Sequence, residues 1–365
     1  MLTNALIKQY IEVLKDAIEI DVIYGGKEDI LLRGNFTSPV EMSNPDILNR
    51  IKHLPGKSEV IMTEPKVVIR VQMPGKTGLR KIPWVNIGMF VITLLFTLIA
   101  GAAHAGIDYF SNPELFWKAP LTILGAGMPF SFSLLGILLF HEFGHYIASR
   151  LHGVKVTLPY FIPFPSPLLG TMGAVIRLKS PFITRKQLLD VGAAGPLAGM
   201  VIAIPLVIWG LAHPNFVPDT PAMVGLLYLG DSLLFIIISG IVQPPIPDGL
   251  IAVLNPVAFA GWVGFLVTML NLLPIGQLDG GHILYAMFGK AQHKIVYAIM
   301  AGMIILSFWW FGWLIWVILG FFLVKPKHPP TVLDDIPLDK KRLTIGYLCI
   351  IIFILCFVPI PFMGL

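Results

Sequence analysis

Charged side chains are scarce in this sequence. They make up 13% of its 365 residues, whereas hydrophobic side chains make up 56%. A typical soluble domain carries about twice that charged share, so the composition excludes an ordinary soluble protein and indicates a polytopic membrane protein. The formal net charge of +5 is modest. It indicates basic loops facing anionic lipid headgroups of a bilayer, and no nucleic-acid partner.

Cysteine is rarer still, because Cys349 and Cys356 are the only two in the chain. Their spacing puts them on one helical face, too far apart along the axis for a disulfide within the helix. Both lie in the last apolar segment, far from the histidines considered below. A cysteine-ligated zinc site is therefore excluded, and we expect both thiols to serve as apolar filler.

The charges that do occur are concentrated at the start of the chain. Residues 1–83 hold 22 of the 47 charged residues. A helical pattern over 2–19 is followed by short β-rich runs at 21–25, 29–33 and 66–73. We therefore predict a small soluble α+β domain at 1–83. The first residues lack the apolar core of a secretory signal peptide and are too acidic for a typical transit peptide, so we expect neither.

Apolar segments long enough to cross a bilayer begin at Trp84. The expected spans are 85–104, 120–151, 187–211 and 253–273, followed by an apolar run at 295–324. That last run is long for one span and short for two, and Gly312 within it is a possible break. The predicted fold class is a polytopic α-helical membrane protein with about six or seven membrane segments. The predicted divisions after the soluble domain are a first span and loop (84–119), a membrane core (120–290) and C-terminal membrane segments (291–365).

Two further stretches separate the expected spans. A Pro-rich stretch at 159–173 cannot form a continuous helix. A weakly polar stretch at 212–250 contains no Lys or Arg, and we expect it to be a loop. The bias of Lys and Arg places the N-terminal domain in the cytosol, or on an equivalent inner side, and the 212–250 loop on the other side. The basic cluster after Val324 fits this orientation only if 295–324 forms a hairpin of two short helices.

The sequence HEFGH (141–145) closes an apolar run in which Lys118 is the previous charged residue. In a helix His141 and His145 are one turn apart on one face, so both imidazoles can reach a single ion. Glu142 lies about 100° round the helix, next to that ion without competing for it. This is the spacing that a zinc hydrolase needs. The alternative, polar residues that merely cap a span, is disfavoured because ionisable clusters beside lipid are costly and usually functional.

A zinc ion held by two histidines needs a further protein ligand. Asp279, within NLLPIGQLDGGHILYA (271–286), is the only acidic residue between Asp248 and Asp334. Both motifs end spans that are expected to run in the same direction, so they should meet near the same membrane face. Two alternatives stay open: Asp279 as a plain turn residue, and His282 as the ligand instead. We favour a supporting or packing role for His282.

HEFGH on one span, followed by N-x-L-P-x-x-x-L-D-G-G on a later one, resembles the site-2 protease family of intramembrane zinc metalloproteases. The likeness covers roughly residues 120–290. It implies one catalytic zinc ion bound by His141, His145 and Asp279. It also implies that Glu142 is the catalytic base and that Asn271 helps to position the substrate or the developing oxyanion.

Two weaker likenesses refine this interpretation. The segment GAAGPLAGM (192–200) looks like the small-residue helix of the family, which lets a span pack close to the metal-binding helices. The soluble start, with its ILLRGNF, is similar to the plastid yellow-green branch and to archaeal relatives. No PDZ insertion separates the catalytic spans, which differs from the bacterial stress-response members.

The resemblance implies hydrolysis of peptide bonds within or near transmembrane segments of membrane-protein substrates. A substrate helix must unwind before attack, and VTLPYFI and GAVIRLK within 156–180 are suited to pairing with an extended substrate strand. The alternative for that stretch is a re-entrant loop that only seals the site. The rival function is a membrane metal-ion transporter or metal-handling protein. It is disfavoured because the polar residues converge on one site and form no series along a path. A further alternative is an HExxH membrane protease that cuts a lipidated or soluble tail. The sequence indicates no oligomeric state.

Overall fold

The computed structural model describes residues 2–25, 29–37, 44–63, 66–72, 82–109, 111–219 and 228–363. The chain forms two compact units, Met1–Ile82 with Leu178–Ile183, and Pro83–Arg177 with Thr184–Leu365. Each unit has its own hydrophobic core.

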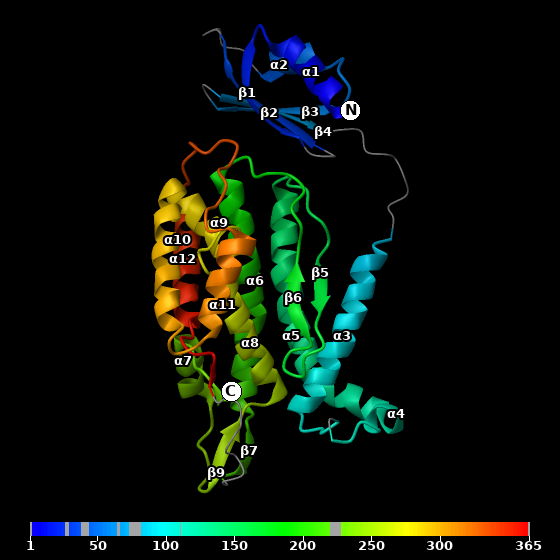
Figure 1. The fold of residues 1–365 in the computed structure, drawn as a ribbon, viewed down its shortest axis with the longest axis vertical. Coiled ribbons are helices and arrows are strands. Elements are labelled where there is room, and N and C mark those ends of the chain that lie inside the picture. Colours follow the sequence, from blue (N-terminus) through cyan, green and yellow to red (C-terminus); the bar gives the residue numbers. More distant parts are fainter. Residues whose placement is uncertain are drawn as a thin grey trace. The chain divides into compact units, whose positions relative to one another are not determined.

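The N-terminal unit is a four-stranded antiparallel sheet with two helices (Figure 1). Its elements are α1 Leu2–Leu14, β1 Ile18–Gly25, β2 Asp29–Phe36, α2 Asn44–Ile51, β3 Lys57–Thr63 and β4 Lys66–Gln72. The strand order is β1-β2-β4-β3. Apolar residues of α1 and α2 join alternate residues of β2 and β4 in one buried cluster, because successive strand residues point to opposite faces of a sheet.

The sequence patterns missed α2 and β3 in this unit. In α2, NPDILNRI, the residues that are both apolar and buried are Ile47 and Ile51, one turn apart. That is too short a pattern to stand out from a loop. In β3, KSEVIMT, a charged residue and the polar Ser58 begin the strand, so its β-rich character is weak. Pairing with β4 along its whole length defines the strand.

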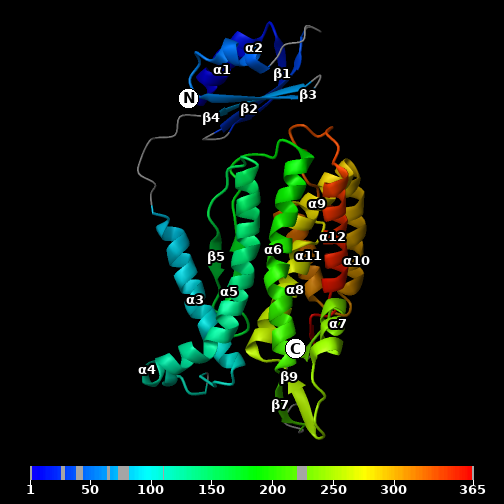
Figure 2. The same ribbon diagram turned by 180° about the vertical axis from the view of Figure 1, so that it is seen from behind.

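The membrane unit is a bundle of helices with three small β-pairs (Figures 1 and 2). Its helices are α3 Trp84–His104, α4 Leu115–Lys118, α5 Pro120–Leu151, α6 Arg185–Ala212, α7 Leu233–Val242, α8 Pro256–Asn271, α9 Asp279–Phe288, α10 Gln292–Leu306, α11 Gly312–Leu319 and α12 Lys340–Cys356. A 3-10 turn, η2 Gly289–Ala291, precedes α10, and a π-helical turn, η3 Gly320–Val324, continues α11.

Three of the described helices, α3, α5 and α6, are long and apolar enough to cross a bilayer by length and composition. Three shorter apolar helices are α7, α8 and α11 continued by η3. Helix α5 packs against both α3 and α6, and α6 also packs against α8 and α9. Figure 2 shows α5 and α6 running side by side. Helix α6 therefore lies between the helix that carries HEFGH and the segment that carries the LDGG motif.

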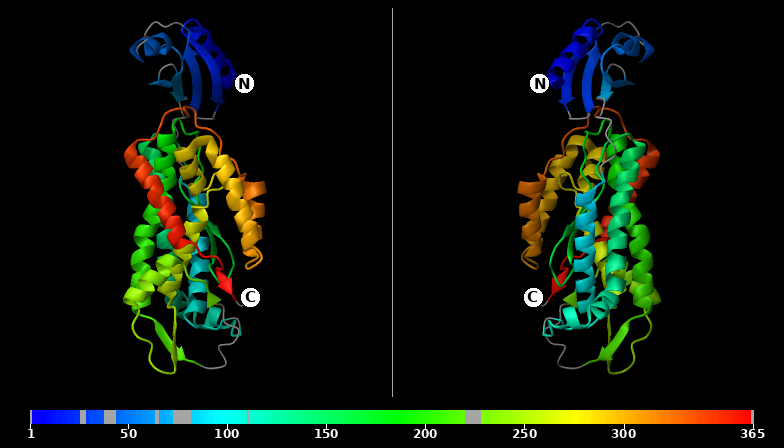
Figure 3. Two further views of the ribbon diagram at one scale, coloured as in Figure 1. Left: turned by 90° about the vertical axis from the view of Figure 1, so that its left-hand side faces the viewer. Right: turned by 90° about the vertical axis from the view of Figure 1, so that its right-hand side faces the viewer.

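The apolar run expected at 295–324 is two helices. Helix α10 ends at Leu306, and α11 begins at Gly312 after a turn. Aromatic residues crowd that turn in the sequence SFWWFGW, and Phe308 is largely exposed. Figure 3 shows the α10–α11 pair and α12 on opposite sides of this unit.

The expectation of a loop throughout 212–250 is wrong over α7. Its ten residues, LLFIIISGIV, are too few to suggest a membrane span, so the sequence pattern gave no reason to separate them from the loop. Ser232 begins the helix by accepting a hydrogen bond from the backbone N–H of Phe235. The rest of the region contributes β7 Asn215–Pro218, β8 Tyr228–Leu229 and β9 Leu250–Val253, where β7 pairs with β9 and β8 with β10 Phe362–Met363.

The Pro-rich stretch after α5 is a short β-hairpin. Strand β5, Tyr160–Pro163, pairs antiparallel with β6, Thr171–Val175. The hairpin packs against α3 through both strands and against α5 through β6. The carbonyls of Leu158 and Pro159, just before β5, accept hydrogen bonds from the Asn86 side chain on α3. The hairpin thus runs along the helix that carries HEFGH.

Candidate metal centre

Helix α5 carries His141 and His145 on one face, as their spacing requires. Both side chains are buried, with 4% and 6% of their surface exposed. The helix continues for more than a turn beyond His145 to Leu151, so both histidines lie within regular helix. Their positions are therefore fixed by the backbone of α5 and not by a loop.

Helix α6 approaches this face of α5 through small residues. A Cβ atom built on Gly195 would lie 2.0 Å from Nε2 of His145, and one on Gly199 would lie 3.4 Å from Nδ1 of His141. Nδ1 of His145 lies 2.7 Å from the backbone oxygen of Val191 on α6. Since a carbonyl can only accept, Nδ1 carries the proton, and Nε2 presents a lone pair.

Asp279 comes from a different part of the chain. It is the first residue of α9, after the non-helical turn that follows α8. That turn is tight: a Cβ on Gly280 would lie 1.9 Å from the backbone oxygen of Leu272, and Gly276 has a φ of +51°. Glycine tolerates both conditions, since it has no Cβ and adopts positive φ freely. The glycines of the motif therefore allow the turn that brings Asp279 to α5.

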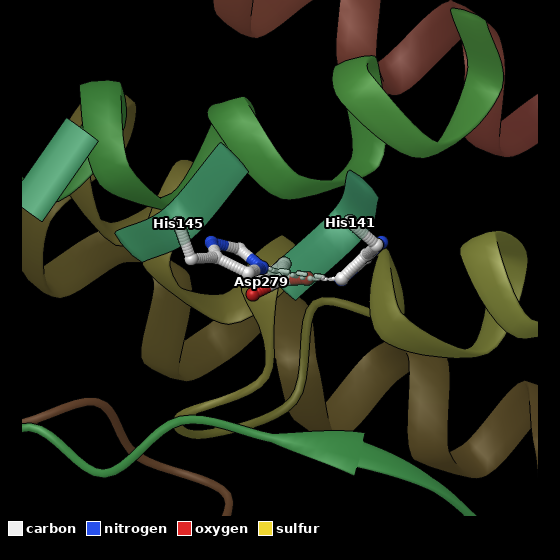
Figure 4. A group of neighbouring side chains, drawn as sticks. All are labelled: His141, His145 and Asp279. Carbon is white, nitrogen blue, oxygen red and sulfur yellow. Dashed lines mark hydrogen bonds and ion pairs between the residues drawn. The ribbon is translucent and has the colours of Figure 1, made fainter. Parts of the chain in front are cut away.

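Figure 4 shows His141, His145 and Asp279 pointing toward one another. The Nε2 atoms of the two histidines are 3.1 Å apart. Each lies 3.2 Å from Oδ2 of Asp279. Within the described part of the chain, this is the single group of three or more His, Cys, Asp or Glu side chains arranged to hold a metal ion.

The three atoms form a triangle that fits a metal ion. Ligands at about 2.0–2.1 Å from a tetrahedral zinc ion are about 3.3 Å apart, close to the observed edges. Two neutral imidazole nitrogens and a carboxylate also match the donors of a catalytic zinc site. Three lone-pair acceptors buried this close repel one another unless positive charge lies between them. Donor chemistry and spacing therefore both fit a divalent cation.

Glu142 and Asn271 lie beside this triangle. Glu142 is buried, and the backbone N–H of Ile176, just after β6, lies near its carboxylate. Nδ2 of Asn271, the last residue of α8, lies 3.3 Å from Nε2 of His141. The structure thus brings the five candidate site residues of the sequence together from α5, α8 and α9.

His282 is outside the group of candidate ligands. Its Nδ1 lies 2.7 Å from Nε2 of His328, in the segment between η3 and α12. The alternative in which His282 replaces Asp279 as a ligand is therefore not the arrangement found. Cys349 and Cys356 are both buried and unpaired with each other.

Sequence reasoning missed two features of the site. The carbonyl of Val191 orients His145, but every residue has a carbonyl, so no sequence signal marks this one. The contact of Ile176 with Glu142 depends on how the β-hairpin packs on α5, which is equally invisible. The run GAAGPLAGM was the one available signal, because its small residues predicted a close approach of α6.

Comparison with known proteins shows which family this sequence matches. The sequence profile described as Peptidase family M50 matches residues 129–315, which is just over half of the chain. The chain belongs to Peptidase family M50. The matched region includes HEFGH on α5, the small-residue part of α6 and the turn that carries Asp279. As a member of this membrane-protease family with several long apolar helices, the M50 chain is an integral membrane protein.

Several curated plant proteins are similar to the M50 chain. Probable zinc metalloprotease EGY1, chloroplastic, of Arabidopsis thaliana is 33% identical over 50% of this chain and 34% of its own length. Probable zinc metalloprotease EGY2, chloroplastic, of Oryza sativa subsp. indica is 27% identical over 97% of this chain and 67% of its own length. The Arabidopsis thaliana EGY2 is 30% identical over 76% of this chain and 49% of its own length.

The M50 chain therefore spans between about a third and two thirds of the length of these relatives. No solved structure matches it. The metal-ion transporter that the sequence left as a rival function receives no support from the family or from these relatives. The similarity to plastid proteins agrees with the branch that the N-terminal sequence resembled.

Proposed function

We propose that this chain is an intramembrane zinc metallopeptidase that hydrolyses peptide bonds within or near transmembrane segments of other membrane proteins. The observation that carries the proposal is the convergence of two distant helices on one buried point. His141 and His145 from α5 and Asp279 from α9 present ligand atoms 3.1–3.2 Å apart. The relatives named as probable zinc metalloproteases support the same activity.

In this proposal His141, His145 and Asp279 hold one zinc ion. When bound, zinc lowers the pKa of water and polarises a carbonyl oxygen. The proton on Nδ1 of His145 is held by the carbonyl of Val191, which keeps Nε2 available as a ligand and fixes the orientation of the ring. The small residues of α6 leave the space that the two imidazoles occupy.

Glu142 is the proposed general base. It adjoins His141 in the HExxH sequence, and its carboxylate is buried and lies near the backbone N–H of Ile176. A carboxylate oxygen of Glu142 accepts a proton from the attacking water and then passes it to the nitrogen of the leaving amine. A buried carboxylate suits this task, because it is shielded from competing bulk water.

Asn271 is the proposed oxyanion donor. Its Nδ2 lies 3.3 Å from Nε2 of His141, so the amide is at the edge of the ligand triangle. An N–H donor at this place can donate to the oxygen of the scissile carbonyl as negative charge develops there. The same contact is consistent with a role in positioning the substrate before attack.

Strand β6 is the proposed platform for the substrate. A transmembrane helix keeps its carbonyls in its own hydrogen bonds, so it must become extended before attack. The backbone that leaves β6 reaches Glu142 through Ile176, and the neighbouring side chains of Met172 and Val175 are exposed. A substrate strand alongside β6 would therefore pass close to the general base. In the alternative, the hairpin only seals the site.

The proposed division of the chain follows the sequence prediction. A soluble α+β domain occupies 1–83 on the cytosolic or equivalent inner side. The first span and loop follow at 84–119, the catalytic membrane core at 120–290, and further membrane segments at 291–365, for about six or seven segments in all. A cysteine at the exposed Lys52, compared with one at the exposed Asn112, should react with an impermeant maleimide from opposite sides of sealed vesicles. Labelling of both positions from the same side would contradict the orientation.

Glu142→Gln tests the proposed reaction. The purified variant should bind zinc as the wild type does, because the carboxylate is not a proposed ligand. Its cleavage of a single-span substrate, followed by mass spectrometry, should fall by at least about 10²-fold, the usual contribution of a general base. Glu114→Gln, at the start of α4 and away from the site, is the matched control.

The possible outcomes separate the functions considered. Retained proteolysis in Glu142→Gln would remove the proposed mechanism. Loss of cleavage together with loss of zinc would show that the residue supports the metal centre and would contradict its assignment as base alone. Flux of zinc across vesicles, retained in Glu142→Gln, would favour the transporter.

A further inference from the structure

His282 and His328 form a buried pair whose role the proposed chemistry does not explain. His282 is one turn after Asp279 on α9, and His328 lies in the segment between η3 and α12. Both side chains are buried, and Nδ1 of His282 is 2.7 Å from Nε2 of His328. The pair ties the helix that begins with Asp279 to a segment 46 residues further along the chain.

The hydrogen-bond partners fix which nitrogen of each ring carries the proton. Nδ1 of His328 is bonded to the backbone oxygen of Pro329, and since that oxygen can only accept, Nδ1 must donate. In a neutral ring Nε2 is then an acceptor, so the hydrogen bond from His282 must be donated by its Nδ1. The two hydrogen bonds therefore run in one direction: His282 donates to His328, and His328 donates to Pro329.

Gln292 binds the segment that carries His328 to the turn that precedes Asp279. This first residue of α10 is fully buried, with 0% of its surface exposed. Its Nε2 donates to the backbone oxygens of Pro274 and Pro326, each at 3.3 Å. Its Oε1 accepts from the backbone N–H of His328 at 3.4 Å. One side chain thus joins the α8–α9 turn to the segment that carries His328.

The turn and the segment also touch directly. The backbone N–H of Gly276 donates to the oxygen of Pro326 at 3.0 Å. A Cβ on Gly276 would lie 1.9 Å from the backbone oxygen of Lys325. The two backbones are therefore packed so closely that no side chain fits between them. Lys325 itself has a φ of +64°, a conformation that costs a non-glycine residue energy and persists only when its surroundings impose it.

The segment is in turn anchored beyond His328. The ring of Tyr285 stacks on that of His328, with ring centres 4.7 Å apart, and its hydroxyl donates to Asp334 at 2.9 Å. Nε of Arg185, at the start of α6, donates to the backbone oxygen of Asp334 at 2.6 Å. The segment 325–334 is therefore held by α6, α9 and α10 together, and can act as a rigid support.

Asp279 is the ligand that most needs such a support. The other two candidate ligands lie in the middle of α5, whereas Asp279 begins a helix after an irregular turn. Its place relative to α5 depends on what holds that turn. The polar ties fall on both sides of it, through Pro274 and Gly276 before and His282 after. Backbone groups of a non-helical turn packed within a membrane protein must find such partners.

We propose that His328 and Gln292 are positioning residues for Asp279, and that His282 acts through its Nδ1 donor to His328. By holding the α8–α9 turn, they keep the Asp279 carboxylate within reach of the two histidines. This inference rests on the proposed metal centre. Outer residues that orient a ligand commonly contribute about 10–100-fold to metal affinity, and we expect an effect of that size.

The test compares two substitutions of His282 in the whole 365-residue chain. The amide nitrogen of asparagine can stand near the place of Nδ1, whereas that of glutamine stands nearer the place of Nε2. His282→Asn should therefore keep the donor to His328 and bind zinc within about threefold of wild type, while His282→Gln and His328→Ala should bind about 10–100-fold more weakly. His213→Ala, whose ring bonds to Trp209 within α6 and its cap, is the matched control and should bind as the wild type does.

Two readouts separate positioning from a general loss of stability. Zinc affinity is measured by competition with a chromophoric chelator, and the visible spectrum of the Co²⁺-substituted protein reports the ligand geometry. His282→Gln and His328→Ala should change the cobalt spectrum at temperatures well below their unfolding midpoints. His282→Asn should keep the wild-type spectrum. Neither readout depends on proteolysis.

Each other result overturns a stated idea. Equal affinity and identical cobalt spectra in all variants would remove the positioning role, as would equal loss in His282→Asn and His282→Gln. If His328→Ala fails to fold, the comparison of His282→Asn with His282→Gln decides the question alone. A wild-type protein that binds neither zinc nor cobalt would contradict the proposed function itself, which distinguishes that failure from failure of this inference.

Discussion

A methyl group on Gly195 of α6 would lie 2.0 Å from Nε2 of His145 on α5. That nitrogen is the atom that faces the other two candidate ligands. The same helix accepts the proton of the opposite ring nitrogen through the carbonyl of Val191. Helix α6 therefore determines the position of His145 twice, by a hydrogen bond on one side and by the lack of a side chain on the other.

Gly195→Ala should weaken zinc binding while leaving the membrane unit folded. The added methyl cannot fit without moving the imidazole, and overpacking of this kind costs about 1–3 kcal/mol. If the strain is present when zinc is bound and relieved when it is not, zinc affinity should fall about 5- to 150-fold. Gly136→Ala on α5, where a Cβ would meet nothing within 4 Å, is the control. Equal zinc affinity in the two variants would contradict the close approach of α6.

Asn271→Ala should lower kcat and leave zinc content unchanged. Removing one oxyanion donor commonly costs about 10²–10³-fold in kcat, and the amide of Asn271 is the side-chain donor that adjoins His141. If the residue instead only binds substrate, KM should rise with kcat unchanged. Steady-state cleavage of a single-span substrate in detergent or vesicles distinguishes the two. Wild-type values of both constants would show that the residue has neither role.

Proline in β6 should reduce cleavage without loss of zinc. The backbone N–H groups of consecutive strand residues point to opposite sides of the strand. Of Ala174→Pro and Val175→Pro, one therefore removes an N–H donor on the side of β6 away from β5. Each lost hydrogen bond is worth about 0.5–1.5 kcal/mol, and cleavage should fall about 2- to 10-fold for that position. Ile176 is left unchanged because its N–H contacts Glu142. Val175→Ala controls for loss of the side chain, and unchanged cleavage in both proline variants would favour a hairpin that merely seals the site.

Gly127→Ala should destabilise the contact between α3 and α5. A Cβ at Gly127 would lie 1.9 Å from the backbone oxygen of Leu98, whereas a Cβ at Gly125 would meet nothing within 4 Å. Both changes favour helix by a similar intrinsic amount, so their difference isolates the packing cost of about 1–3 kcal/mol. The unfolding midpoint in detergent should be lower for Gly127→Ala than for Gly125→Ala. Equal midpoints would contradict the close crossing of the two helices.

The ligands were accessible to sequence reasoning because their signals are local. His141 and His145 share a helix face by spacing alone, and Asp279 stands out as a lone acid in a long apolar region. The partners that orient these ligands were not accessible. The carbonyl of Val191 and the ring of His328 become neighbours of the site only through the way in which helices cross, and a single sequence carries no record of that.

The same contrast holds for the fold. Long apolar runs such as α5 are marked by composition, because crossing a bilayer needs many consecutive apolar residues. Short elements are not: α7 has only ten residues, and α2 has its buried apolar residues at only two positions. Their structure depends on the surfaces they pack against, which lie elsewhere in the chain. Tertiary contacts decide such elements more than local propensity does.

Zinc content of Asp279→Ala, measured beside wild type after gel filtration, tests the central claim most directly. The proposal predicts one zinc ion per wild-type chain, and much less in the variant because only two protein ligands remain. Asp248→Ala, an exposed acid outside the site, should bind as the wild type does. Full zinc occupancy in Asp279→Ala, or none in the wild type, would contradict a metal centre built from α5 and α9.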